Sequence, residues 1–234
     1  MRLHKKMKKS LTLSLHVLLA ILGQCAAQYA QAARPFVTDD ARTVDLGGCQ
    51  IETFYKEQRA YSGSEFWFLP ACNPFGIELT AGGNRIEDEK SLVLQGKTLL
   101  KPLETNGYGF AFTLGTFYVN PQEGGNVWSP YVNGIASFSF LDDRAVVHTN
   151  LGAIHDRIAG MDRATWGIGL EALLLAPRLY GILETYGQRA DKPTLHGGLR
   201  FWIVPNKLQV DSTVGEQKSD PVRRFYTVGL RVLF

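Results

Sequence analysis

The last eight residues of the chain, 227–234, alternate strictly between two faces. The apolar members fall on one face: Val228, Leu230, Val232 and the terminal Phe234. The polar or small members fall on the other: Thr227, Gly229 and Arg231. A period of two is that of a β-strand. A soluble protein rarely ends on a long two-faced strand with a terminal aromatic residue, because nothing beyond such a strand covers its edge.

The spacing of four of these residues, Thr227, Gly229, Val232 and Phe234, resembles the C-terminal targeting signal of bacterial outer-membrane β-barrels. That resemblance implies that the last strand is read by the barrel-assembly machinery, which would be a partner of this chain. We therefore expect these four residues to act as an assembly signal.

The N-terminus has the anatomy of a secretory signal. It begins with five basic residues, Arg2, Lys5, Lys6, Lys8 and Lys9. They are followed by the apolar run Leu11 to Leu22 and then by small residues around Ala27 to Ala33. The apolar run is too short to span a bilayer. We predict a cleavable signal peptide at residues 1–32, with cleavage after Ala32 or Ala33 favoured and cleavage after Ala27 as the alternative.

Removal of the signal changes the charge balance. The full chain has 25 Lys and Arg against 22 Asp and Glu, but five of the basic residues precede residue 33, so the mature chain is slightly acidic. The composition therefore gives no support for nucleic-acid binding. No mature segment is a continuous apolar run of about 18 residues, so no transmembrane helix is expected.

Two cysteines remain in the mature chain, Cys49 and Cys72. In an exported protein such a pair is most simply a disulfide. The alternatives are a metal site, for which too few histidines lie nearby, and two free thiols. We expect no metal and no cofactor.

Two-faced segments recur along the mature chain at the spacing of barrel strands. We predict twelve strands: 50–58, 65–72, 76–86, 91–101, 108–119, 130–140, 145–155, 164–175, 178–188, 194–204, 207–216 and 222–234. Pro70 makes the second strand the weakest of these predictions. Compact turns alternate with longer polar loops, as in outer-membrane barrels. We therefore predict an all-β, antiparallel up-and-down barrel over 49–234, monomeric, preceded by an irregular periplasmic lead-in at 33–48. A soluble ligand-holding barrel is the alternative.

The strand faces divide into an aromatic set and a set of Gly and charged residues. In residues 108–119, for example, Phe110, Phe112 and Leu114 oppose Ala111, Thr113 and Gly115. This division is expected when the apolar face meets lipid. The charged residues assigned to the lumen are Glu78, Lys97, Glu171, Glu184, Arg200, Asp211 and Arg231, together with His148. They either tie adjacent strands together as ion pairs or line a solute path and set its selectivity.

Several segments are similar to a known family. They are Arg34-Pro35-Phe36-Val37-Thr38-Asp39-Asp40, Leu183-Glu184-Thr185-Tyr186-Gly187, and residues 204–215 with the terminal strand. They resemble the outer-membrane transporter family named for the meta-cleavage pathway of phenol degradation. The resemblance implies an outer-membrane barrel and, through the family name, small aromatic solutes. The Cys49–Cys72 pair is not a feature of that family.

We therefore expect a passive channel of a Gram-negative outer membrane, surrounded by outer-membrane lipid and open to a small polar or aromatic solute. A non-conducting structural or assembly barrel is the alternative. An enzyme is a third class, since barrels that hydrolyse lipids carry a Ser/His pair on their outer wall. For that class the sequence offers only His155, followed by Asp156 and Arg157, and a solvated loop histidine is the simpler interpretation.

Overall fold

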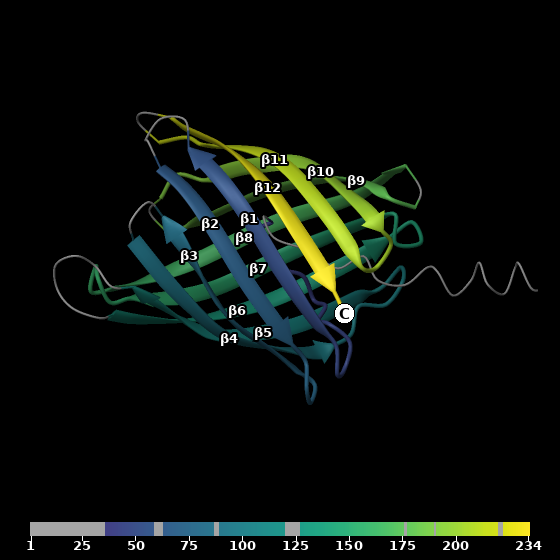
Figure 1. Cartoon of the computed structure of the whole chain (residues 1–234), viewed down its shortest axis with the longest axis horizontal. Coiled ribbons are helices and arrows are strands. Elements are labelled where there is room, and N and C mark those ends of the chain that lie inside the picture. Colours follow the sequence, from purple (N-terminus) through teal and green to yellow (C-terminus); the bar gives the residue numbers. More distant parts are fainter. Residues whose placement is uncertain are drawn as a thin grey trace, which may run out of the picture. The chain divides into compact units, whose positions relative to one another are not determined.

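The computed structural model describes residues 36–58, 63–86, 89–119, 127–175, 177–189, 191–219 and 222–234. These form twelve antiparallel strands: β1 (Cys49–Gln58), β2 (Gly63–Cys72), β3 (Ile77–Ile86), β4 (Glu89–Lys101), β5 (Tyr108–Val119), β6 (Val127–Phe140), β7 (Ala145–Asp156), β8 (Met161–Leu175), β9 (Leu179–Gln188), β10 (Thr194–Val204), β11 (Leu208–Gln217) and β12 (Arg223–Leu233). Each strand pairs with its neighbours in sequence, and β1 pairs with β12, so the sheet closes into a barrel (Figure 1). The predicted fold class and all twelve predicted strands are confirmed.

The terminal strand closes the barrel. Residues 225–233 of β12 pair with residues 50–58 of β1, and Cys49 and Phe234 exchange backbone hydrogen bonds beyond the last rung. Phe234 itself is 70% exposed at the barrel's edge. Closure leaves no free strand edge, so the terminal strand, residues 227–234, has a partner on both sides.

Pro70 does not end β2, although it cannot donate a hydrogen bond to a ladder. Register with β1 runs without a break from Cys49–Cys72 to Gln58–Gly63, whereas the β2–β3 ladder skips Leu69 and Pro70. Gly82 lies across this gap, and a Cβ there would come within 2.3 Å of the Phe68 carbonyl oxygen. A glycine therefore lets β3 approach β2 where the ladder is interrupted.

The two faces of the wall are as the alternation predicts. Alternate residues on the outside are exposed and apolar, among them Phe110, Phe112 and Leu114, whereas Ala111 and Thr113 between them are buried in the barrel. No helix that is long and apolar enough to cross a membrane occurs among the described residues.

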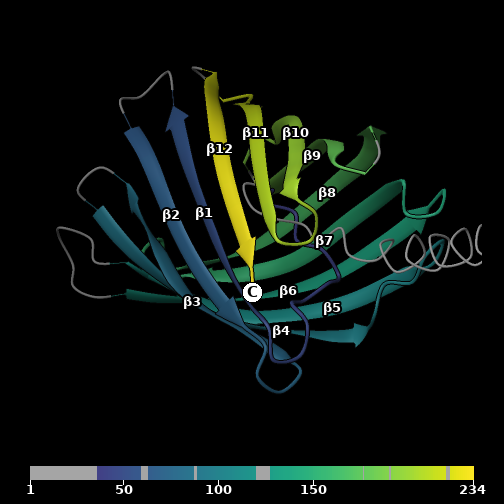
Figure 2. The same ribbon diagram turned by 45° about the vertical axis from the view of Figure 1, so that its right-hand side comes forward.

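The two ends of the barrel differ, and we name them by their connections. The turn end carries Phe234 and short turns in which Asn106 and Asn206 have positive φ, a conformation that Asn tolerates better than most residues. The loop end is the opposite one, where β1, β3 and β5 end and β2, β4 and β6 begin (Figure 2). The predicted signal peptide at 1–32, the loop 121–126 and parts of the loops 61–64 and 216–221 lie outside the described residues.

The predicted disulfide between Cys49 and Cys72 is present. The two residues are direct partners in the β1–β2 ladder, with Cα atoms 4.1 Å apart and sulfur atoms 2.08 Å apart. The bond closes the first hairpin at the turn end, as the predicted hairpin requires.

The barrel interior as the candidate functional site

A segment of the chain fills the middle of the barrel. Residues 36–44, the inserted segment, have no regular secondary structure, and five of them are buried: Phe36, Thr38, Asp40, Ala41 and Val44. Their backbone bonds to side chains on the inner faces of four strands, β3, β6, β7 and β9. The expected periplasmic lead-in therefore does not describe residues 36–44, which lie inside the barrel.

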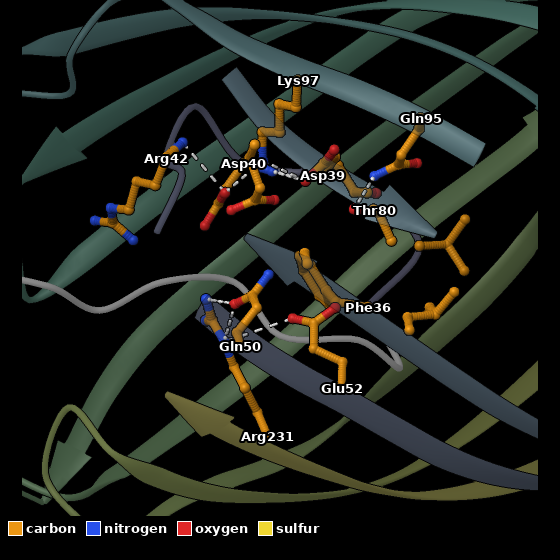
Figure 3. Close-up of a pocket in the computed structure, with 15 residues that line it drawn as sticks. Phe36, Asp39, Asp40, Arg42, Gln50, Glu52, Thr80, Gln95, Lys97 and Arg231 are labelled. Atoms are coloured by element: carbon orange, nitrogen blue, oxygen red, sulfur yellow. Dashed lines mark hydrogen bonds and ion pairs between the residues drawn. The ribbon is translucent and has the colours of Figure 1, made fainter. Parts of the chain in front are cut away.

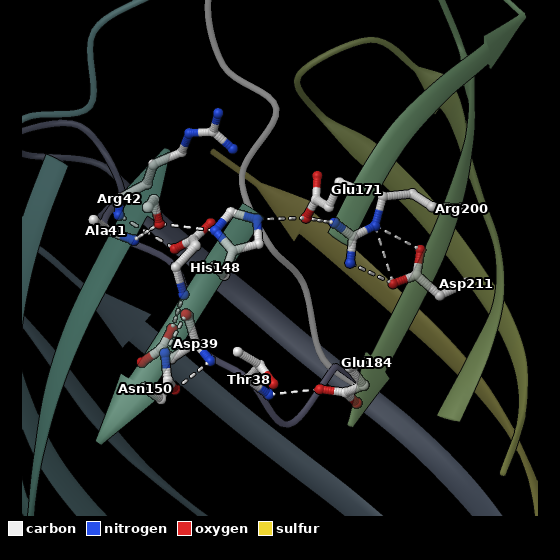
Figure 4. Close-up of polar contacts among 12 residues, drawn as sticks. Thr38, Asp39, Ala41, Arg42, His148, Asn150, Glu171, Glu184, Arg200 and Asp211 are labelled. Atoms are coloured by element: carbon white, nitrogen blue, oxygen red, sulfur yellow. Dashed lines mark hydrogen bonds and ion pairs between the residues drawn. The ribbon is translucent and has the colours of Figure 1, made fainter. Parts of the chain in front are cut away.

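The apex of the inserted segment is held by β9 and β7. The Val37 and Thr38 amides donate to the Glu184 carboxylate at 2.9 and 2.7 Å. Asn150 bonds the Asp39 backbone twice, accepting from its N–H at 2.7 Å and donating to its carbonyl at 2.8 Å (Figure 4). Side chains of the wall thus replace the partners that a strand would have given this backbone.

The next residues are held by β6 and β3. The Ala41 amide donates to Ser137 Oγ at 2.8 Å, and the Val44 amide donates to Glu78 Oε2 at 2.7 Å. Glu78 is one of the charged residues predicted to face the lumen. It is buried, and its bond to Val44 holds the end of the inserted segment that leaves the barrel.

An ion pair joins the inserted segment to β4. Lys97 Nζ lies 2.8 Å from Asp39 Oδ1 and 3.1 Å from Asp40 Oδ1 (Figure 3). Lys97 and Asp40 are almost fully buried, whereas the Asp39 side chain keeps about a quarter of its surface exposed. Buried charges of this kind need a partner, so the lysine and the two aspartates depend on one another.

Two glycines of β8 make room for the inserted segment. A Cβ at Gly167 would lie 2.7 Å from Thr38 Oγ1, and one at Gly169 would lie 2.4 Å from the Phe36 ring. The inner face of β8 therefore forms a shallow seat for Phe36 and Thr38. The glycines that the sequence places on this face serve close packing.

The inserted segment is anchored where it leaves the barrel at the turn end. Asn73 donates from its side chain to the Val44 carbonyl at 2.8 Å, and its backbone bonds Gly47 and Gly48. Gly47 has a φ of 81°, which a glycine adopts without strain. The chain turns there to begin β1, so the Val44 end is fixed close to the Cys49–Cys72 disulfide.

Three of the predicted lumen residues form one buried network. Arg200 lies between Glu171 and Asp211, with nitrogen–oxygen distances of 2.5 and 2.9 Å (Figure 4). All three side chains are at most 1% exposed. They tie β8, β10 and β11 together, and no solute can contact them in this arrangement.

The other predicted residues belong to different networks. Arg231 donates to Gln50 Oε1 at 2.8 Å and lies 3.5 Å from Glu52 (Figure 3). Glu184, which bonds the inserted segment, also bonds His196 at 2.6 Å. The five residues of β8–β12 that were predicted to place charges in the lumen therefore do not form a single wall cluster. Arg231 and Lys97 line a cavity of about 30 Å³ beside the inserted segment, a volume large enough for one or two water molecules.

The assembly residues occupy both faces of β12. Thr227 is buried inside the barrel, Gly229 faces inward beside Asp211, and Val232 lies on the outer face. Their recognition by assembly machinery remains a prediction.

Two features of the interior were not predicted from the sequence: the position of the inserted segment inside the barrel, and the aromatic rings on the inner face. Phe54 stacks on Trp67 at 5.4 Å, and Phe117 stacks on Tyr131 at 4.9 Å. These rings occur at inward positions of their strands, in register with buried Glu52, Glu65, Thr113 and Ser129. The sequence could have indicated this, because each ring lies an even number of residues from an inward-facing residue of the same strand.

The enzyme alternative has two candidate groups. Inside the barrel, Ser137 Oγ lies 2.8 Å from His148 Nδ1, and His148 Nε2 lies 3.7 Å from Glu171, but Ser137 and His148 have no exposed surface. On the surface, His155 Nδ1 bonds Asp162 at 2.7 Å. The described contacts of His155 therefore pair it with a carboxylate and include no serine.

The sequence matches the model of the family described as uncharacterised conserved protein UCP029691 over residues 18–234. No curated protein sequence matches at a significant level. The match does not confirm the resemblance to the meta-cleavage family.

Two solved structures share the fold. The KdgM porin in complex with disordered oligogalacturonate has a TM-score of 0.57 and 14% identity, covering 78% of this chain and 98% of that chain. The outer membrane protein Omp33 of Acinetobacter baumannii has a TM-score of 0.50 and 8% identity, covering 80% and 97%. At these identities the likeness concerns the fold, which is that of outer-membrane β-barrels.

Proposed function

We propose that this chain, which belongs to the family of uncharacterised conserved protein UCP029691, is an outer-membrane channel for small solutes that its own residues 36–44 close. The observation that carries this proposal is the inserted segment itself. It occupies the middle of the barrel, and the cavity beside it that Lys97 and Arg231 line, of about 30 Å³, has room for only one or two water molecules. A solute could cross this barrel only if the segment moved.

The wall supports movement of the segment, because its contact residues have second partners within the wall. Glu184 bonds His196 at 2.6 Å, Ser137 bonds His148 at 2.8 Å, and Asn150 bonds Asn133 at 3.1 Å. Lys97 stands directly opposite Glu78 in the β3–β4 ladder. Release would therefore let Lys97 exchange the two aspartates for Glu78, and no wall charge would be left without a partner.

The energetic balance is also close. Ordering the nine residues of the segment costs on the order of 10 kcal/mol in backbone entropy. Its hydrogen bonds, at about 1 kcal/mol each, and the burial of Phe36, at about 2 kcal/mol, offset a similar amount. The open and closed states would then differ by only a few kcal/mol, which is the range of a gate.

Transport would be passive diffusion through a polar lumen in the outer membrane of a Gram-negative cell. The outer apolar band of the barrel supports contact with lipid, and the N-terminal signal supports export. The resemblance to the meta-cleavage family favours small aromatic solutes. The mixture of lysine, arginine and carboxylates around the path favours solutes without a strong charge.

A non-conducting structural barrel is the second candidate, favoured by the enclosed Glu171–Arg200–Asp211 network. A cross-link distinguishes the two candidates. A Cβ at position 167 would lie 3.5 Å from the Thr38 Cβ, within the roughly 3.5–4.5 Å that a disulfide needs. The double variant Thr38→Cys/Gly167→Cys should therefore fasten the segment to β8 when it is oxidised.

Conductance in planar bilayers is the measurement. We expect openings in the wild type, none in the oxidised double variant, and their return on reduction. Wild-type protein treated with the same reductant controls for opening of the native disulfide, and Gly167→Cys alone controls for the added side chain. Equal conductance in the oxidised and reduced variant would refute the gate, and silence in every form would favour the structural barrel.

A further inference from the structure

The half of the lumen between the inserted segment and the loop end has a different lining from the half between the segment and the turn end. Its inner face carries five partly exposed rings, on β1, β2, β5, β6 and β9: Phe54, Trp67, Phe117, Tyr131 and Tyr186. Space remains beside them, because Val37 at the apex of the segment is 55% exposed although its amide bonds a buried carboxylate. Rings and open space thus meet above the closed gate.

Four of these rings form two stacked pairs, Phe54 with Trp67 and Phe117 with Tyr131. A Cβ at Gly115, the direct partner of Tyr131, would come within 2.5 Å of the Tyr131 ring. Phe117 stacks on that ring, with 30° between the planes, and Phe54 stacks on Trp67 with 12° between the planes. Because Gly115 has no side chain, the Tyr131 ring can lie over the β5 backbone with Phe117 packed against it, and both rings stay partly exposed.

Fixed hydrogen-bonding groups stand beside these faces. Glu65 accepts from Trp67 Nε1 at 3.1 Å, from Gln58 at 2.9 Å and from Lys56 at 3.1 Å. The Tyr131 hydroxyl donates to Gln95 at 2.6 Å. The Lys56–Glu65 pair is neutral overall, so this surface combines ring faces and polar groups without net charge.

We infer that this half of the lumen binds neutral sugars; this rests on the proposed channel and names a solute class in place of the aromatic solutes that the resemblance implies. A sugar ring has an apolar face of C–H groups that stacks on an aromatic ring, and hydroxyls at its rim that bond amides and carboxylates. A small aromatic solute such as phenol has a single hydroxyl, so it would cover several of these polar groups while bonding only one of them, which is costly. The stacking pairs on β1–β2 and β5–β6 are the sugar platforms.

Isothermal titration of the detergent-purified protein with maltohexaose, cellohexaose and phenol tests the inference. We expect at least one neutral hexasaccharide to bind and phenol not to bind. Trp67→Leu and Tyr131→Leu should each weaken sugar binding roughly fivefold to tenfold, as expected for loss of one stacking face. Binding of phenol alone, or of none of the three probes, would overturn the inference.

A matched control lies on the opposite face of the same wall. Tyr118 and Trp128 form an outward-facing pair, also 4.9 Å apart, on β5 and β6. Trp128→Leu should leave sugar binding unchanged, and an equal loss in Trp128→Leu and Tyr131→Leu would contradict the platform. The oxidised Thr38→Cys/Gly167→Cys protein should still bind sugar from the loop end. Failure of the gate and failure of the sugar site are therefore observed separately.

Discussion

The ion pair between Lys97 and the inserted segment gives the sharpest prediction. The double variant Asp39→Asn/Asp40→Asn changes only the segment, so it acts on the closed state. In the open state both side chains would be hydrated, and Lys97 would face Glu78 as before. The variant should therefore favour opening.

The change in the free-energy difference between the open and closed states follows from the burial of the ion pair. Breaking a buried ion pair by removing one partner costs about 3–5 kcal/mol. Asp39 is partly exposed and Glu78 lies opposite Lys97, so we reduce this to about 2–3 kcal/mol. Because about 1.4 kcal/mol corresponds to a factor of ten, the ratio of open to closed channels should rise roughly 30- to 150-fold.

Single-channel recording in planar bilayers measures this ratio directly. Asp45→Asn is the control, since it removes one carboxylate of the same kind from an exposed residue next to the segment. Combining the double variant with the Thr38–Gly167 cross-link should abolish the added openings. An open probability equal to that of Asp45→Asn would refute the assigned role of the ion pair.

Three further predictions concern assembly and stability. Deletion of Phe234 should lower the amount of barrel in the outer membrane and leave protease-sensitive periplasmic material, as seen by fractionation; normal insertion would contradict the assembly signal. Cys49→Ser/Cys72→Ser should lower the free energy of unfolding by about 3 kcal/mol, because the bond closes a loop of 23 residues; urea titration measures this, and an unchanged midpoint would argue against it. Arg200→Met should cost about 3–5 kcal/mol, since it leaves Glu171 and Asp211 buried without their partner, and should lower the temperature at which the folded form is lost on electrophoresis. Arg224→Gln, which breaks an exposed pair worth about 0–1 kcal/mol, is its control, and equal losses would contradict the role of burial.

The sequence by itself determined the wall of this protein. A period of two fixes which side chains of a strand share a face, so the alternation in residues 227–234 and in the other eleven strands predicted the number of strands and the inward position of Glu78, Lys97 and Arg200. Closure was expected from the terminal strand, whose edge needs a partner. The Cys49–Cys72 pair followed from the first hairpin, because hairpin register is local.

Only the tertiary structure decided what fills the barrel. The inserted segment has no periodicity, and its partners are remote in the chain: Val37 and Glu184 are separated by 147 residues. Which lumen charges pair with one another also depends on strand stagger around the closed ring, so Glu171, Arg200 and Asp211 meet while Glu184 and Arg231 join other networks. Alternation assigns a residue to the inside, but the contacts made there depend on distances across the barrel that local sequence does not encode.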